Sequence, residues 1–122
     1  MPITIEITTG ISIPFSAVIG KGFYIGHFSG IILHSDTKIG ENCNIGTGVI
    51  IGTQGLGDRG VPIIGDNVYI GVGAKILGGI KIGNNVKIGA NAVVITDIPD
   101  NATAVGIPAK IVKIAAVQKD TI

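Results

Sequence analysis

The sequence predicts an all-β fold: a parallel β-helix of about five triangular coils, formed by a single domain over residues 1–122. Three observations support this prediction. Aliphatic residues recur at every sixth position, and the chain contains 20 glycines. It has no tryptophan and only three Phe and two Tyr, although 46% of its residues are hydrophobic. Because large rings normally fill a broad core, a core of Ile and Val indicates a narrow prism.

The six-residue period is clearest in the C-terminal half. Its leading aliphatic residues are Ile64, Ile70, Ile76, Ile82, Ile88 and Val94. A second apolar side chain follows each of them by four positions: Val68, Ala74, Ile80, Val86, Ala92 and Ile98. This period fits neither an α-helix nor a half-exposed strand, but it fits short strands joined by tight turns in which glycine accepts positive φ. Three strands then close a coil of about 18 residues, which places Ile64 under Ile82.

Two earlier runs share the period. The second is led by Leu33, Ile39, Ile45 and Ile51, and the first by Ile7, Ile13, Ile19 and Ile25. The phase slips by two residues near Gly30–Ile32, and a loop insertion at about 53–62 separates the second run from the third. We expect the short C-terminal tail, about 106–122, to cap or pack along the last coil.

Other fold classes fit poorly. Amphipathic helices need apolar residues at i+3, i+4 and i+7, and each glycine would cost them about 1 kcal/mol relative to alanine. A βαβ sheet needs helical segments, and none precedes residue 108. A core this thin buries little apolar area per residue, so we expect self-association. The period alone does not give the handedness of the coils.

The charge balance restricts the class of partner. The net charge of +1 indicates neither nucleic acid nor an anionic membrane. The single cysteine, Cys43, excludes an internal disulfide and fits a reducing compartment. The first residues lack the basic and apolar regions of a signal peptide, and no apolar run reaches the length of a membrane span. We therefore expect a cytoplasmic protein with no nucleic-acid partner and no membrane span.

Two histidines are the candidate catalytic side chains. His27 stands two positions after Ile25, points outward in the repeat, and adjoins the phase slip, where an irregular coil can form a pocket. His34 follows Leu33 at a turn. Both could equally be solvated surface residues. Two histidines cannot supply a three-histidine zinc site, so no metal is expected.

The interruption between Gly52 and Pro62 is the second candidate region. It breaks the period and carries Asp58 and Arg59. Long loops in compact repeat proteins tend to be functional, which favours a loop that reaches a neighbouring subunit over a passive insertion. Residues 55–60 match G-x-G-x-x-G formally, but no βαβ unit surrounds them, so the dinucleotide interpretation is rejected.

From about Ile11 to Val112 the sequence resembles the C-terminal catalytic domain of bacterial serine acetyltransferases. The similar stretches are Ile19-Gly-Lys-Gly-Phe-Tyr-Ile-Gly-His-Phe-Ser-Gly-Ile31, Gly57-Asp-Arg59, Ile70-Gly-Val-Gly-Ala-Lys-Ile-Leu-Gly-Gly-Ile80 and Val105-Gly-Ile-Pro-Ala-Lys-Ile-Val112. The resemblance implies a left-handed β-helix and a homotrimer with active sites between subunits. It implies acetyl transfer from acetyl-CoA to a small hydroxyl-bearing acceptor, either serine or a sugar.

The resemblance also implies roles for individual residues. His27 coincides with the family's catalytic histidine, which removes the proton from the attacking hydroxyl, a task that suits an imidazole titrating near neutrality. The backbone amide of Gly52 is the candidate donor to the oxyanion. Arg59, with Asp58 beside it, and Ser12 fall at acceptor-binding positions. Arg59 would face the serine carboxylate.

The same comparison places the co-substrate. The positions that meet the pantetheine arm through backbone groups correspond to Gly71, Val72, Gly89 and Ala90, whose small side chains let the backbone approach closely. Lys110 and Lys113 are candidates for the CoA phosphates, and each could equally be a solvated lysine of the tail.

The sequence departs from the family pattern at three positions. Ser12 replaces the acid that orients the histidine, Gly26 replaces the acid before it, and Gly60-Val61 replaces the histidine after Asp-Arg. Asp36, close to His34, is a possible substitute acid. These departures leave two alternatives open. One is an O-acetyltransferase of cell-surface polysaccharide biosynthesis, which the Ile-Gly-His-Phe stretch also resembles. The other is a non-catalytic β-solenoid scaffold, which would bind no CoA.

Overall fold

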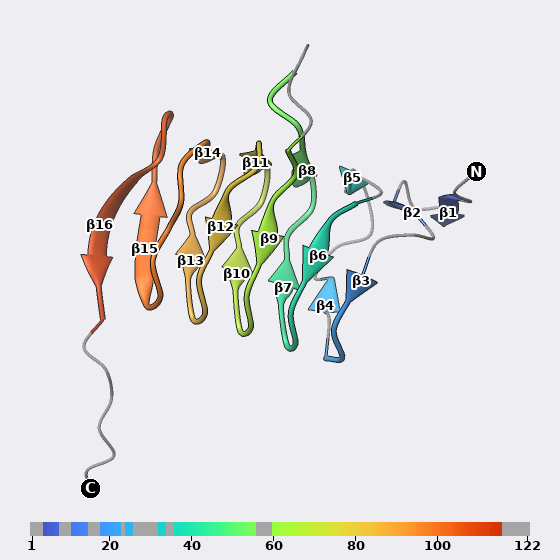
Figure 1. Ribbon diagram of the computed structural model, residues 1–122, viewed down its shortest axis with the longest axis horizontal. Helices are drawn as coiled ribbons and strands as arrows, with labels where there is room; N and C mark the ends of the chain where they lie inside the picture. The colour runs from blue at the N-terminus through green and yellow to red at the C-terminus, as the bar shows by residue number, and fades with distance from the viewer. Residues whose placement is uncertain are drawn as a thin grey trace, which may run out of the picture.

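A computed structural model describes residues 4–7, 11–14, 18–22, 24–25, 32–33, 36–55 and 60–115. This part of the chain winds into a three-walled prism of parallel strands, with the N-terminal strands at one end and the C-terminal strands at the other (Figure 1). It contains no helix, and therefore none that could cross a membrane. The prediction of an all-β solenoid is confirmed.

Three sheets form the walls. Sheet A comprises β1 (Thr4–Ile7), β2 (Ile11–Pro14), β5 (Ile32–Leu33), β8 (Ile50–Gly52), β11 (Lys75–Leu77) and β14 (Val93–Val94). Sheet B comprises β3 (Val18–Ile19), β6 (Lys38–Ile39), β9 (Ile63–Ile64) and β12 (Lys81–Ile82). Sheet C comprises β4 (Tyr24–Ile25), β7 (Asn44–Ile45), β10 (Tyr69–Ile70), β13 (Lys87–Ile88), β15 (Ala102–Val105) and β16 (Lys110–Ile114).

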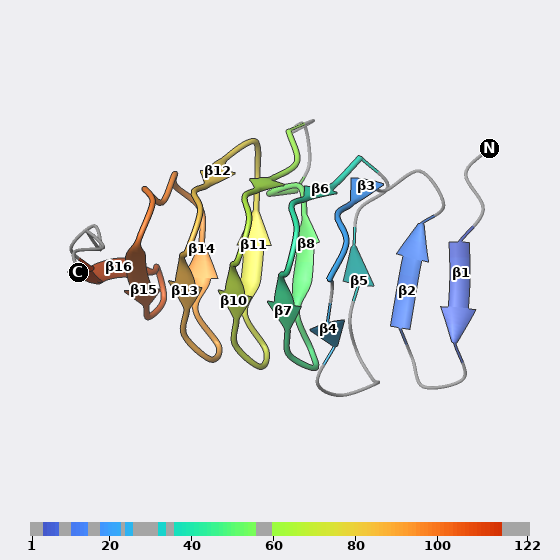
Figure 2. The same ribbon diagram turned by 90° about the horizontal axis from the view of Figure 1, so that it is seen from below.

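The period fixes the register between coils. Ile64 pairs with Ile82 and Ile70 with Ile88, as counting by eighteen predicts. Both aliphatic positions of the repeat point into the prism: Ile70 and Ile76, which lead repeats, are fully buried, and so are Val68 and Ala74 from the second position. The core is therefore a stack of Ile, Val and Ala along the prism axis. Figure 2 shows the coils side by side along that axis.

Both irregularities of the period lie where the sequence predicts them. Ile25 pairs with Ile45, twenty positions on, whereas Leu33 pairs with Ile51, eighteen positions on. The two extra residues therefore fall between Ile25 and Leu33. Ile45 pairs with Ile70, twenty-five positions on, so the loop insertion between β8 and β9 adds seven residues without changing the register. Its described first residues run outward from β8 in Figure 1.

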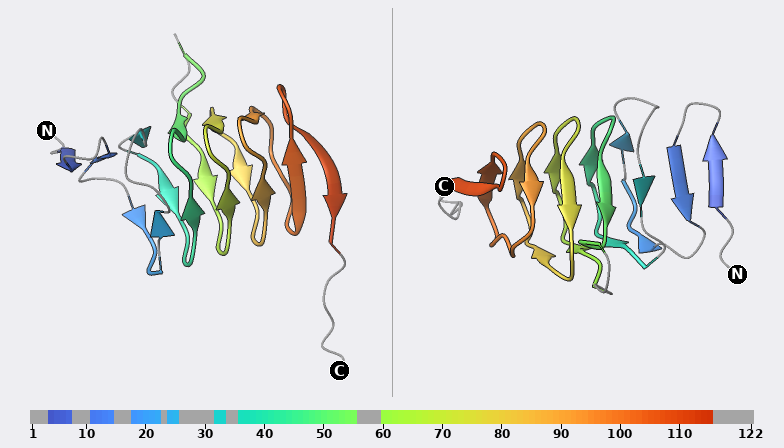
Figure 3. Two further views of the ribbon diagram at one scale, coloured as in Figure 1. Left: turned by 180° about the vertical axis from the view of Figure 1, so that it is seen from behind. Right: turned by 90° about the horizontal axis from the view of Figure 1, so that it is seen from above.

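The two ends depart from the repeat. The spacing of Ile7 predicted that it forms a rung of the coil, and this prediction is wrong. Strand β1 turns back and pairs antiparallel with β2, with Ile7 opposite Ile11. At the other end β16 pairs antiparallel with β15. The described part of the tail packs along the last coil as predicted, and it does so as a strand, which the sequence did not indicate. Figure 3 shows an antiparallel strand at each end of the prism.

Candidate functional site

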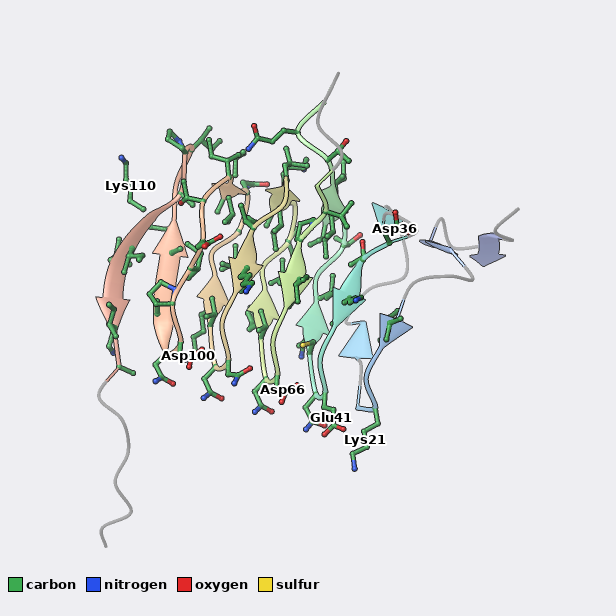
Figure 4. All side chains as sticks on the ribbon, in the orientation of Figure 1. Lys21, Asp36, Glu41, Asp66, Asp100 and Lys110 are labelled. Atoms are coloured by element: carbon green, nitrogen blue, oxygen red, sulfur yellow. The ribbon has the colours of Figure 1, made fainter. Side chains whose placement is uncertain are left out.

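The prism has three corners, and the first, between sheets B and C, is closed by side chains. Its turns have asparagine at positive φ, for example Asn67 at 57° and Asn85 at 60°. The residue before each asparagine donates its backbone N–H to a side chain of the next coil: Glu41 to Asp66 Oδ1 at 2.8 Å, and Asp66 to Asn84 Oδ1 at 2.8 Å. Figure 4 shows Glu41, Asp66 and Asp100 along this edge. The backbone amides of Glu41 and Asp66 at this corner are therefore already hydrogen-bonded within the protein.

The second corner, between sheets C and A, is built differently. Its turns are Thr47–Gly48, Val72–Gly73 and Ala90–Asn91, and the second residue of each has φ between 59° and 77°. Backbone hydrogen bonds join the turns: Gly73 N–H donates to Thr47 O at 2.8 Å, and Asn91 N–H to Val72 O at 2.8 Å. The side chains of Val72 and Ala90 contain no hydrogen-bond acceptor. In the part of the chain that the structure describes, the backbone N–H groups of Val72 and Ala90 have no hydrogen-bond acceptor.

Glycines keep these two amides uncovered. A Cβ on Gly71 would lie 2.7 Å from Ala90 N, and a Cβ on Gly46 would lie 2.8 Å from Val72 N. Any side chain at either position would therefore sit on the amide of the next coil. Since successive coils are about 4.8 Å apart, the corner presents a ladder of N–H donors with bare backbone beside it. Such a ladder suits an extended ligand that carries carbonyl oxygens at intervals.

Two residues of this corner were missed by the sequence analysis. Gly46 follows Ile45 as Gly71 follows Ile70, so the period itself contained the signal. Lys75 is half-buried on the outer face of sheet A, and its Nζ donates to Gly73 O at 2.6 Å and to Gly48 O at 3.4 Å. The sequence gives no sign of these bonds, because Lys75 occupies an outward position that normally faces solvent.

Gly89 and Lys110 lie toward the second corner, whereas Lys113 lies farther along β16. A Cβ on Gly89 would meet the Val105 side chain, 2.7 Å from Cγ1. Val105 lies opposite Lys110 in the β15–β16 pair, so Lys110 continues the line of corner glycines. Lys113 lies opposite Thr103, three residues farther along β16. The structure thus places Lys110 beside the donor ladder and Lys113 away from it.

A cleft adjoins the C-terminal end of this line. It has a volume of about 290 Å³ and is lined by Ile95, Thr96, Ile98, Pro108, Ala109, Lys110 and Ile111. Its walls are mostly apolar. Lys110 is the one charged group of the lining.

Gly52 lies at the third corner, between sheets A and B. It is buried at the end of β8, opposite Leu77, and its carbonyl accepts a hydrogen bond from Gly78 N–H at 2.8 Å. Val72 precedes β11 and Leu77 ends it, so the length of a strand separates Gly52 from the free amides within one chain. A groove of about 390 Å³ lies near this corner on sheet B, lined by Val18, Asp36, Lys38, Val61 and Ile63.

The remaining predicted site residues are not placed. His27, His34, Asp58 and Arg59 lie outside the described residues, and Ser12 is described only by its backbone in β2, in register with Glu6 and Ile32. Their proposed roles stay predictions. Asp36 is exposed, two residues before the start of β6.

Within the described ranges, ionisable groups elsewhere form no second site. Among the described residues no three His, Cys, Asp or Glu side chains come together as a metal site would require. Cys43 is buried in the core, its Sγ donates to Gly65 O at 3.2 Å, and burial raises the pKa of its thiol. It acts there as a small apolar residue.

Sequence comparison places the repeats among known families. The family described as "Bacterial transferase hexapeptide (six repeats)" matches residues 62–96, and "Hexapeptide repeat of succinyl-transferase" matches residues 36–61. A serine acetyltransferase of Staphylococcus aureus is 50% identical over 107 residues, which cover 86% of this chain and 50% of that protein. The chain spans about half the length of most of the curated relatives it matches.

Solved structures give the same result. A serine acetyltransferase of Brucella abortus in complex with coenzyme A superimposes with a TM-score of 0.82 at 34% identity, covering 87% of this chain and 43% of that one. Soybean serine acetyltransferase complexed with serine gives 0.79 at 45% identity, covering 84% and 42%. The fold is the left-handed parallel β-helix.

Proposed function

The chain is a serine acetyltransferase-like hexapeptide-repeat protein, and from this we propose that it transfers an acetyl group from acetyl-CoA to the hydroxyl of serine. The observation that carries the proposal is the second corner. The N–H groups of Val72 and Ala90, which have no acceptor among the described residues and are left uncovered by Gly46 and Gly71, offer a binding line for an extended ligand. Solved relatives that share the fold are complexes with coenzyme A or with serine.

The corner fits acetyl-CoA chemically. The pantetheine arm is an extended chain with two amide carbonyls, and acceptors of that kind match N–H donors about 4.8 Å apart. Lys110 continues the same line and exposes an ammonium group, which suits the CoA phosphates. The bare backbone of Gly71 allows the arm to approach within van der Waals distance. No metal is needed for this binding.

The reaction needs one proton acceptor and one stabiliser of negative charge. We propose that His27 accepts the proton as the acceptor hydroxyl attacks the thioester carbonyl, and that the Gly52 amide donates to the oxyanion so formed. The intermediate collapses by breaking its C–S bond. The imidazolium then returns its proton to the CoA thiolate, so that free CoA and the acetyl ester are released. Arg59 would bind the serine carboxylate.

A second copy of the chain completes the site in this proposal. Gly52 and the free amides of Val72 and Ala90 stand at different corners of one prism, separated by a strand of sheet A. They can act on one thioester only if Gly52 of one copy faces the second corner of another. A homotrimer with three such clefts satisfies this requirement. It predicts a particle three times the 12.4 kDa of the single chain by light scattering.

We also propose that the protein is cytoplasmic. The net charge of +1 and the single buried cysteine fit the cytoplasm. Serine is preferred over a sugar because the relatives are serine acetyltransferases. Ser12 and Gly26, in place of the family's acids, are the reason to screen sugars as well.

The test is a free-thiol assay of CoA release with serine and a panel of sugars. His27→Ala should lower kcat by about two to four orders of magnitude, while the matched variant His34→Ala stays near the wild type. Both variants should keep the wild-type mass. A thermal shift with acetyl-CoA separates an enzyme from a scaffold. Turnover of His27→Ala at the wild-type rate, or no shift with acetyl-CoA, rules the proposal out.

A further inference from the structure

Lys75 is the one described lysine whose ammonium group hydrogen-bonds to the backbone. Its Nζ donates to Gly73 O at 2.6 Å and to Gly48 O at 3.4 Å. These carbonyls belong to two successive turns of the second corner, one coil apart. The side chain is half-buried, and the register neighbours of Lys75 in sheet A are Ile50 and Val93. No acidic residue of the neighbouring rungs therefore competes for the ammonium group.

The bonds matter because of which carbonyls they use. The ladder between turns already uses Thr47 O and Val72 O as acceptors. The carbonyls of Gly48 and Gly73 have no place in that ladder, and without Lys75 they would stand as free acceptors beside the free N–H groups. An acceptor there would repel the amide carbonyls and phosphates of an acyl donor, which are acceptors themselves. The ammonium group removes this conflict.

We infer that Lys75 is a positioning residue for the acyl donor: by binding the Gly48 and Gly73 carbonyls it removes two free acceptors from beside the N–H donors of the second corner. The ligand named here rests on the proposed function, whereas the effect on the corner does not. Lys75 touches no reacting atom and acts through the turns that it holds. It selects for a ligand that presents acceptors to this corner.

The first test follows kinetics. Lys75→Met keeps the length and apolar stem of the side chain but removes its donors. It should raise KM for acetyl-CoA about tenfold, equivalent to about 1.4 kcal/mol, with kcat at saturation within about twofold of the wild type. Lys75→Arg should recover most of the loss. The matched control Lys81→Met, on the outer face of sheet B, should leave both constants unchanged. A fall in kcat at unchanged KM would overturn the inference.

The second test needs no ligand. Hydrogen exchange should quicken about tenfold in Lys75→Met at Gly73 and Asn91, whose N–H groups join the turns of the second corner. Exchange at Asn67 and Asn85, at the first corner, should stay unchanged. Equal exchange in variant and wild type refutes the inference whether or not CoA binds. Faster exchange in a protein that fails to bind CoA refutes the proposed function and supports the role of Lys75 in holding the corner.

Discussion

Gly71→Ala tests the donor ladder most directly. The added Cβ would lie 2.7 Å from Ala90 N, 2.9 Å from Gly89 C and 3.0 Å from Ala90 Cα. All three are backbone atoms of the next coil, so none of these contacts can be relieved by a side-chain rotation. The methyl group would stand on the Ala90 N–H, which the ligand is proposed to reach.

The stability cost follows from the same contacts. Forcing the coils apart costs about 1–3 kcal/mol, as overpacking does in cores. Gly71 is not among the glycines with positive φ, so alanine fits its backbone and recovers about 0.4–1 kcal/mol through the unfolded state. The net loss of about 1–2 kcal/mol should lower Tm by about 4–8 °C. Losing the Ala90 donor should weaken CoA binding at least about thirtyfold.

Gly65→Ala is the matched control. Gly65 follows Ile64 as Gly71 follows Ile70, and its Cβ would meet Asn84 Oδ1 and lie 2.9 Å from the C and O atoms of Gly83 in the next coil. It stands at the first corner, where side chains already occupy the amides. Both variants should melt lower by similar amounts in a thermal scan. Only Gly71→Ala should lose CoA in titration calorimetry well below Tm. Equal CoA affinity in the two variants would refute the ladder as the donor site.

Three further predictions concern the prism itself. Thr37 is fully buried and its Oγ1 has no hydrogen-bond partner in the described structure, so Thr37→Val should raise the unfolding free energy by about 1–2 kcal/mol in urea; a loss of stability would contradict this. Asn67 has φ 57°, so Asn67→Ala should cost about 1–2 kcal/mol and Asn67→Gly much less; equal costs would argue against a backbone effect. Burial raises the pKa of the Cys43 thiol, so above about pH 8.5 the unfolded chain loses this proton first and stability falls as pH rises. The free energy of unfolding, measured by urea melts across that pH range, should fall less steeply with pH in Cys43→Ala than in the wild type.

Much of the fold follows from counting residues. In a coil of fixed length each residue lies under the residue one coil later, so Ile64 meets Ile82, and the two-residue slip before Leu33 changes the pairing distance from twenty positions to eighteen. The site was less accessible to this reasoning. Gly71, Val72 and Ala90 were named through family resemblance, and Gly46, which the period implies equally, was overlooked.

The six-residue spacing could not tell a rung from a reversal. Ile7 precedes Ile13 by six positions, which is the spacing of consecutive rungs, yet β1 folds back on β2. An aliphatic residue satisfies both arrangements, because each buries one face of a strand. The sequence carries no residue that decides between them.

The sequence by itself determined the three-walled prism, the aliphatic core and the places where the coils are interrupted, because each depends on spacing along the chain. Only the tertiary structure decided which backbone amides stay free, because that depends on the residue standing one coil away. At the first corner Asn84 caps the Asp66 amide, whereas at the second corner Ala90 has no side chain able to cap Val72. The same turn geometry is therefore closed at one corner and open to a ligand at the other.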